Sequence, residues 1–179
     1  LQPGNEGKNA EILHGAWTAA CRHALSALAD IRPELMRADA RWVSGFVFDR
    51  DMRACHMPIC GISHGLLLNP VDAAGRARFK LSDPASMKTL IAEAIHEVSH
   101  VAGDRHDECF ASTMTNLVAA IRDREIERDI RDEMERMRDW QRLRQDAIEN
   151  AIRAALKANA HTPPEDRDAA DSELQVGCR

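Results

Sequence analysis

One stretch constrains this chain more than any other, because residues 96–106 read H-E-x-x-H-x-x-G-x-x-H. Two histidines four residues apart lie one above the other on a single helix face. Each imidazole can offer a nitrogen to the same zinc ion, and the neighbouring Glu97 can hold a water molecule on that ion. Three protein ligands leave a fourth position open, which is typical of a catalytic zinc site. The sequence therefore predicts that His96, His100 and His106 bind one Zn²⁺ ion, with Glu97 as the catalytic residue.

The flanking residues predict a helix with defined ends. Asp83 is a good N-cap, and Pro84 would occupy the first helical position, where its missing N–H costs nothing. Gly103 stands where a left-handed residue commonly ends a helix. Apolar residues at helical spacing predict one buried face, whereas Glu93, Glu97 and the ligand histidines would face a cleft.

The chemistry expected of such a site is hydrolysis. Zinc lowers the pKa of a bound water toward about 7 and polarises the scissile carbonyl group. Glu97 would accept the proton of that water and deliver it to the leaving nitrogen. His64 and Arg105 are candidate donors to the oxyanion only because they are near in sequence. Two roles stay open for Asp107, which could orient a ligand histidine or cap the next helix.

The remaining pattern predicts an α+β fold with a small, mostly antiparallel sheet. Residues 11–30 carry apolar side chains at helical spacing, as expected of a scaffold helix that covers a sheet. Residues 41–48 and 65–68 are expected to be strands. We expect the second strand to form the substrate-side edge and to bind peptide by strand addition. Pro58 and Gly61 predict an irregular path before it.

The chain is expected to contain three regions. Residues 1–125 would form the domain that carries the metal site. Residues 126–160 combine a thin apolar stripe with many neighbouring charges of opposite sign, which predicts a long helix. This helix could be solvated, fold back on the domain, or form a coiled-coil arm for a protein partner or for self-association. Residues 161–179 would be a disordered tail.

The cysteines bear on a second metal site and on the compartment. Cys55, His56, Cys60 and His64 have the spacing C-H-x-x-x-C-x-x-x-H, which matches none of the common zinc patterns. We therefore expect buried thiols and ordinary histidines there. The chain has five cysteines at irregular spacing, an odd number that does not indicate a disulfide framework. A reducing cytoplasm is the expected location.

The charge balance limits the classes of partner. The chain has 24 basic and 29 acidic residues and a net charge of −5, so no overall attraction to nucleic acid or to an anionic membrane is expected. A local basic patch stays compatible with this balance. No apolar run approaches the roughly 20 residues needed to span a bilayer. The expected partner is a protein or peptide substrate.

The motif resembles the signature of the metzincin metallopeptidases, and the Asp after the last histidine resembles their adamalysin-like branch. A metzincin also has a Met-turn beneath the metal. Met114 is the nearest candidate, but it falls on an apolar helical stripe with Phe110 and Leu117, so we predict that it lies in the core. The sequence departs from the metzincin pattern at this point.

Residues 60–120 resemble the WLM and SprT-like metallopeptidases more closely. The resemblance lies in His96-Glu97…His100…His106-Asp107-x-x-Phe110 and in a short strand before the helix that ends in Asn69-Pro70. It implies an intracellular minimal zincin with these three histidines as zinc ligands and Glu97 as the catalytic residue. The best-known members of those families cleave proteins attached to DNA, but this acidic chain shows no obvious DNA-binding tail.

The sequence thus predicts a cytoplasmic zinc metalloendopeptidase with a zincin-like domain. Two alternatives stay open. The same chemistry could act on a non-peptide ester or amide. The chain could also be a non-catalytic interaction module that keeps zinc for stability and uses its charged helix to bind partners.

Overall fold

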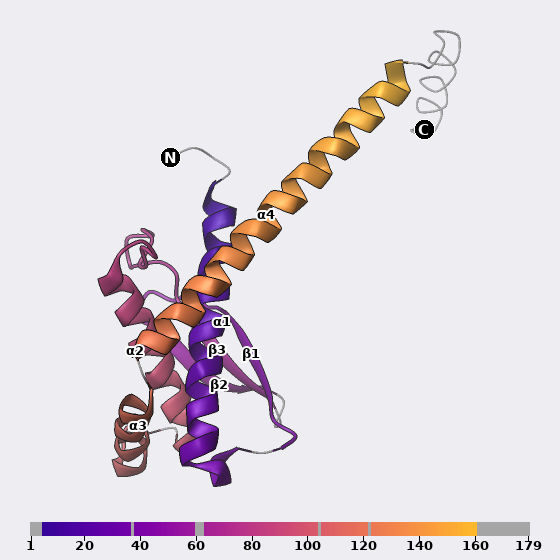
Figure 1. Ribbon diagram of the computed structural model, residues 1–179. Coiled ribbons are helices and arrows are strands. Elements are labelled where there is room, and N and C mark those ends of the chain that lie inside the picture. Colours follow the sequence, from indigo (N-terminus) through magenta and orange to yellow (C-terminus); the bar gives the residue numbers. More distant parts are fainter. Residues whose placement is uncertain (1–4, 37, 60–62, 104, 122, 161–179) are drawn as a thin grey trace, which may run out of the picture. The chain divides into compact units, whose positions relative to one another are not determined.

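The computed structural model describes residues 5–36, 38–59, 63–103, 105–121 and 123–160 and shows an α+β fold (Figure 1). The predicted disordered tail, residues 161–179, lies outside the described residues. The chain divides into two compact units, Leu1–Arg138 and Asp139–Arg179. The helices are α1 (Asn5–Ile31), α2 (Pro84–Ser99), α3 (Glu108–Ala120) and α4 (Asp123–Ala160), and the strands are β1 (Arg41–Phe46), β2 (Ala54–Ile59) and β3 (Ser63–Leu68).

The three strands form a mixed sheet in the order β1-β3-β2. β1 pairs with β3 in parallel, and β2 pairs with β3 antiparallel, so the expectation of a mostly antiparallel sheet was wrong. β3 was also expected to be the substrate-side edge, but it is the central strand and is paired on both sides. The side chains of Leu66 and Leu68 are both buried and lie on the same face of this central strand, because residues two apart in a strand share a face.

β2 was not expected as a strand, because Pro58 predicted an irregular path. The structure places Pro58 inside β2, which is an edge strand. A proline is tolerated at a sheet edge because its missing N–H need not join the ladder. Gly61, the other residue on which that expectation depended, lies outside the described residues.

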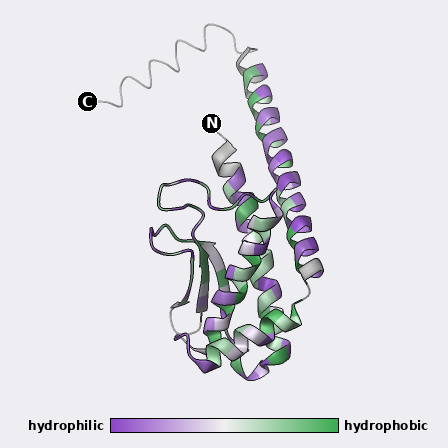
Figure 2. Ribbon diagram, turned by 90° about the vertical axis from the view of Figure 1, so that its left-hand side faces the viewer, coloured by the Kyte–Doolittle hydropathy of each residue, from purple (hydrophilic) through white to green (hydrophobic). Residues whose placement is uncertain are grey.

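α1 is the predicted scaffold helix, and its buried residues pack against the sheet and against α2. The Trp17 side chain is fully buried, and its Nε1–H donates a hydrogen bond of 2.8 Å to the carbonyl oxygen of Leu66 in the central strand. α1 and α2 lie on the same side of the sheet in Figures 1 and 2. The core of the first unit therefore lies between this helical layer and the face of the sheet that carries Leu66 and Leu68.

The start of α2 agrees with prediction, and its end differs. The Asp83 carboxylate accepts the N–H of Ala85 at 3.1 Å, and Pro84 is the first helical residue. α2 ends in a 3₁₀ turn, His100–Ala102, and Gly103 follows with φ 170° and ψ 145°. This conformation is extended, so the expected left-handed glycine was wrong. The 3₁₀ turn instead provides a hydrogen-bond donor for a backbone carbonyl group at the end of the helix. The N–H of Gly103 donates to the carbonyl oxygen of His100 at 3.1 Å.

The first half of α4 belongs to the first unit. Ile126, Ile130 and Met134 are buried members of its core. Asp129 also forms an ion pair of 3.3 Å with His23 of α1. The boundary between the units therefore lies after Arg138, whereas the sequence suggested a boundary after residue 125.

The helices differ in how apolar they are. Figure 2 shows broad hydrophobic regions on α1 to α3, whereas hydrophilic residues dominate α4. None of the helices in the described ranges is long and apolar enough to cross a membrane.

Replacing Ile130 by Ala tests whether α4 contributes to the core. The side chain is fully buried, so its truncation is expected to lower the free energy of unfolding by about 2–4 kcal/mol, measured by urea denaturation. Val118→Ala is the control, because Val118 is 56% exposed, and it should change stability by less than about 0.5 kcal/mol. Equal, small effects of both substitutions would show that the first half of α4 does not pack into the core of the first unit.

Candidate metal centre

The three predicted ligands come together in the structure. His96 lies in the last turn of α2, His100 begins the 3₁₀ turn, and His106 lies just before α3. One ring nitrogen from each can be chosen so that all three lie within 4.8 Å of one another. The Nε2 atoms of His96 and His106 are 3.2 Å apart. The group can hold a metal ion.

Two features of the donors fit a metal ion. Four tetrahedral ligands at 2.0–2.1 Å from zinc are separated from one another by roughly 3.3 Å, which is close to the 3.2 Å between Nε2 of His96 and Nε2 of His106. The Nδ1 atom of His100 lies 3.2 Å from the carbonyl oxygen of Gly103. A carbonyl oxygen can only accept, so Nδ1 carries the proton and Nε2 keeps its lone pair for a metal.

Phe110 forms a common support for the three imidazoles. Its ring is buried, and its centroid lies 5.1 Å from that of His96, 4.7 Å from that of His100 and 4.6 Å from that of His106. These contacts restrict the orientation of each imidazole. The helical spacing of Phe110 from Met114 and Leu117 assigned it to the apolar stripe of α3. That spacing does not indicate its contact with the three histidines. Its position in the first turn of the helix after His106 is the signal that could have indicated the second role.

Close packing also favours the neutral form of His96. Burial lowers the pKa of His96, and the positive charges that His100 and His106 would carry lower it further. A lowered pKa favours the neutral imidazole at neutral pH. Neutral imidazole is the form that binds metal.

The carboxyl group of Glu97, the residue that follows His96 in α2, is buried. Only 4% of the residue is exposed. Burial raises its pKa to about 7, the negative charge of Glu93 adds to the rise, and the backbone N–H of His56, which donates to the carboxylate, opposes it. A group with this pKa can both accept and donate a proton near neutral pH.

A row of rings leads from β1 to the metal ligands. Trp42 stacks on His64 at 4.5 Å between centroids, and Nδ1 of His64 lies 3.0 Å from Nε2 of His56. The ring of His56 is nearly parallel to that of His100, with centroids 6.5 Å apart. His64 is therefore separated from the ligands by His56. The sequence had named His56 only for a second metal site, and its nearness to Glu97 depends on strand pairing that the sequence does not reveal.

The other predicted site residues lie at the margin. Arg105 is exposed, and the structure gives it no contact with the three histidines in the part that it describes. Cys60, one of the four residues weighed for a second metal site, lies outside the described residues. The free thiol of Cys55 in β2 is partly buried, and this burial raises its pKa.

Asp107 caps α3. Its carboxylate accepts the N–H of Phe110 at 3.1 Å, as an N-cap residue does. Of the two roles left open by the sequence, the capping role is the one that the structure displays. The cap also fixes the first turn of the helix that carries Phe110, directly after the third histidine.

Comparison with known proteins adds no assignment. Searches against protein-family models, curated proteins and solved structures found no match. The interpretation of the site therefore depends on its own residues.

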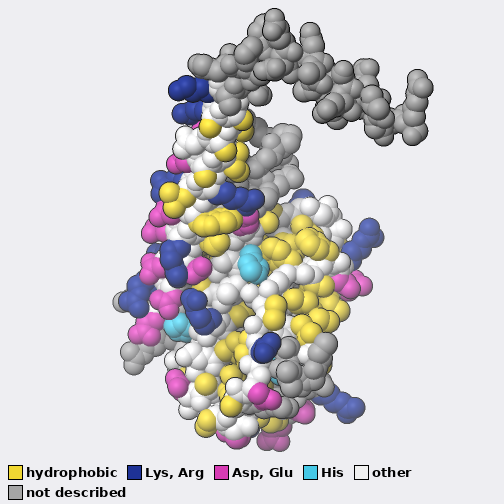
Figure 3. Space-filling model, turned by 90° about the vertical axis from the view of Figure 1, so that its right-hand side faces the viewer, with side chains coloured by type: hydrophobic (Ala, Val, Ile, Leu, Met, Phe, Trp, Pro, Cys, Tyr) yellow, Lys and Arg dark blue, Asp and Glu magenta, His cyan; other side chains and the backbone are white. Residues whose placement is uncertain are grey.

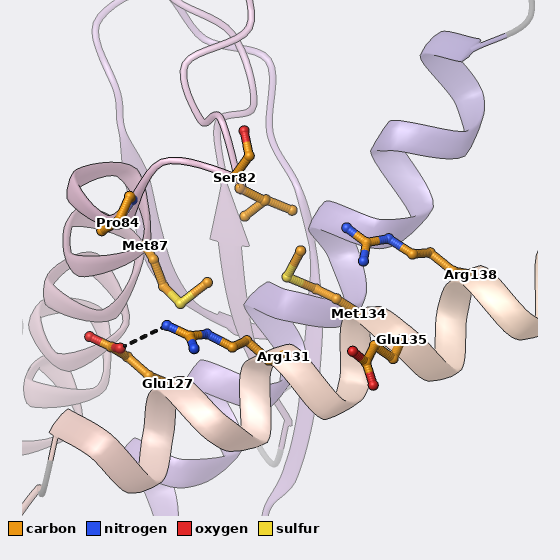
Figure 4. A pocket seen from close by; sticks show the side chains of 9 residues that line it. Ser82, Pro84, Met87, Glu127, Arg131, Met134, Glu135 and Arg138 are labelled. Atoms are coloured by element: carbon orange, nitrogen blue, oxygen red, sulfur yellow. Dashed lines mark hydrogen bonds and ion pairs between the residues drawn. The ribbon is translucent and has the colours of Figure 1, made fainter.

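A pocket of about 260 Å³ lies elsewhere in the first unit (Figure 4). It lies between the loop before α2 and the first half of α4, with Met87 and Met134 among its lining residues. Arg131 and Glu127 form an ion pair of 3.2 Å along its wall. None of the three histidines lines it, so this pocket is not part of the metal centre.

The raised pKa of Glu97 predicts how stability depends on pH in protein freed of metal by a chelator. Between about pH 4.5 and pH 7 the folded state holds a proton that the unfolded state has lost, so stability falls as pH rises. Glu97→Gln removes this loss. The variant should match the wild type at pH 4 and exceed it at pH 8 by up to about 3 kcal/mol, measured by urea denaturation. A constant difference from pH 4 to pH 8 would refute the raised pKa.

Two substitutions of Asp107 separate its capping role from its charge. Asp107→Ala removes the acceptor and should lower the free energy of unfolding by about 1 kcal/mol. Asp107→Asn keeps an acceptor oxygen and should retain most of the stability and the metal affinity. A large loss of metal affinity in Asp107→Asn, with stability unchanged, would instead assign Asp107 to the orientation of a ligand.

Proposed function

We propose that the chain is a zinc-dependent metallopeptidase of the minimal zincin type. The observation that supports this most strongly is the group formed by the His96, His100 and His106 imidazoles, together with a buried Glu97 that directly follows His96 in α2 and whose pKa is raised to about 7. Metal-binding histidines alone would also fit a structural site. A buried carboxyl group that is ready to exchange a proton favours a catalytic one.

The chain's own residues have distinct tasks in this proposal. His96, His100 and His106 would hold one zinc ion through their free ring nitrogens, and Gly103 fixes the tautomer of His100. When bound, zinc supplies a Lewis acid that acidifies water and polarises a carbonyl group. Glu97 accepts a proton from the attacking water and returns it to the leaving nitrogen of the peptide.

The surroundings of Glu97 suit proton transfer. The backbone N–H of His56 donates to the carboxylate, which holds this side chain on the side of α2 that faces β2. Burial limits the access of bulk water to the carboxyl group and raises its pKa to about 7. The carboxyl group would therefore be positioned before a substrate arrives.

The resemblance to WLM and SprT-like peptidases supports the same proposal. Phe110, which belongs to the resembling pattern, packs on all three histidines. Met114 is partly buried against the core, as predicted, rather than placed in a Met-turn. A cytoplasmic location stays part of the proposal and is compatible with the free thiols of Cys21, Cys55 and Cys109.

Glu97→Gln tests the proposal, using zinc-loaded protein and casein as an unstructured substrate. The variant keeps the shape of the side chain but cannot take up the proton. It should retain zinc and lose about 10²–10⁴-fold in kcat/KM for casein cleavage. Cleavage is followed by the release of new amino termini.

Glu108→Gln is the matched control, because it makes the same chemical change at an exposed position in the first turn of α3. It should leave both zinc content and cleavage unchanged. Undiminished cleavage by Glu97→Gln would refute the role of Glu97. Loaded wild-type protein that cleaves neither casein nor other unfolded proteins would reject the peptidase and favour a zinc-stabilised interaction module.

A further inference from the structure

The pocket between the loop before α2 and the first half of α4 has an apolar interior. Met87, near the start of α2, and Met134 in α4 are each 5% exposed, and Figure 4 shows both side chains extending into the cavity. Leu81, in the loop before α2, is partly buried and adds a third apolar wall. Methionine side chains adapt to the shape of what they contact. The interior therefore suits a small aliphatic group.

The volume of the pocket limits the size of a ligand. Its 260 Å³ lie below the roughly 300–1,000 Å³ that are typical of pockets for drug-sized ligands. At roughly 30 Å³ for each water-sized group, the pocket has room for about nine non-hydrogen atoms. A ligand that fills it is therefore a single small molecule rather than a stretch of polypeptide.

Two basic and two acidic side chains line the pocket. Arg131 and Glu127 form an ion pair of 3.2 Å and so neutralise each other. Within the described ranges, neither Glu135 nor Arg138 forms an ion pair or a hydrogen bond. Figure 4 shows the Glu127–Arg131 pair at one end of the cavity and the other two side chains at the opposite end. One positive and one negative group thus remain at that end for a ligand.

The position of these two groups favours a ligand with both charges. Glu135 and Arg138 are three residues apart in α4, and such side chains are neighbours, with Cβ atoms about 5–6 Å apart. Because they are not paired with each other, each can pair with the opposite charge of one small molecule. Figure 3 shows acidic and basic side chains interspersed along α4, so the wider surface favours neither sign. The complementary ligand is neutral overall and carries an ammonium and a carboxylate group.

We propose that this pocket binds a free amino acid with an aliphatic side chain, such as leucine. The side chain lies between Met87 and Met134, the carboxylate accepts hydrogen bonds from Arg138, and the ammonium group donates to Glu135. Leucine has about as many non-hydrogen atoms as the volume admits. This site is separate from the metal centre and does not depend on the proposed peptidase activity.

Other small ligands match the lining less well. A simple carboxylate such as a fatty acid would leave the Glu135 charge without a partner and next to a like charge. An aliphatic amine would leave Arg138 in the same position. A nucleotide exceeds the volume, and its phosphates would require an excess of positive charge that the two acidic side chains cancel.

A titration of the full chain with free L-leucine tests the proposal, followed by NMR of ¹³C-labelled methionine methyl groups. The methyl resonances of Met87 and Met134 should shift saturably, with a dissociation constant on the order of 1 mM. 4-Methylpentanoate is leucine without its amino group, and isoamylamine is leucine without its carboxylate. Each should bind about fivefold more weakly than leucine or worse, because each leaves one charge of the pocket unpaired.

Substitutions assign the two charges. Glu135→Gln and Arg138→Gln should each weaken leucine binding about fivefold, and Arg138→Gln should also remove the preference for leucine over isoamylamine. Arg136→Gln is the control, because Arg136 is exposed on the same helix but does not line the pocket, and it should change the constant less than about twofold. All three changes are at exposed positions, and circular dichroism checks that the helix is retained.

Three results would overturn the proposal. The first is the absence of any saturable shift of the Met87 and Met134 methyl groups up to about 20 mM leucine, well above the expected constant. The second is equal binding of leucine and 4-methylpentanoate, which would show that the ammonium group is not recognised. The third is a response confined to residues 96–110, which would place leucine at the metal centre instead.

Discussion

The hydrogen bond that the backbone N–H of His56 donates to the Glu97 carboxyl group links strand β2 to helix α2. The candidate site depends on both of these elements. His56 lies in the edge strand β2, and Glu97 lies in the last turn of α2. Leu90, Ala94 and Val98, which are fully buried, anchor the side of α2 that faces away from His96. Burial of these side chains fixes the rotation of the helix, which places Glu97 toward β2 and His96 in the group that could hold a metal ion. The Glu97 carboxyl group can be buried because the backbone N–H of His56 donates a hydrogen bond to it. Burial nevertheless raises its pKa.

The third ligand depends on a second, local arrangement. After the 3₁₀ turn the chain reverses, and Asp107 begins α3 by capping it. This start places Phe110 beneath the histidines and His106 beside His96. His106, a loop residue, reaches the other two histidines because the elements on both sides of the loop are fixed by capping and by burial. Small errors in either element would separate the nitrogens by more than one metal ion can span.

The parts of this arrangement that depend on residues close together in the sequence could be predicted from the sequence. Asp83, Pro84 and the spacing of the histidines are local signals, and each was confirmed in position. The strand order was mispredicted, because the pairing of β3 with both β1 and β2 is a non-local choice that leaves no spacing signal. Gly103 was assigned a left-handed conformation from its residue type alone, yet a 3₁₀ turn ended the helix. The role of the His56 backbone N–H could not be predicted, since a backbone group has no signature of its own in a sequence.

The central claim is that three imidazole nitrogens of this chain bind one zinc ion. X-ray absorption at the zinc edge, combined with metal analysis of the purified protein, tests it most directly. We predict about one zinc ion per chain with three imidazole nitrogens at 2.0–2.1 Å, lost when His100 is replaced by Ala. A zinc content far below one per chain that His100→Ala leaves unchanged would contradict the claim. So would sulfur ligands at about 2.3 Å, which would assign the metal to the cysteines instead.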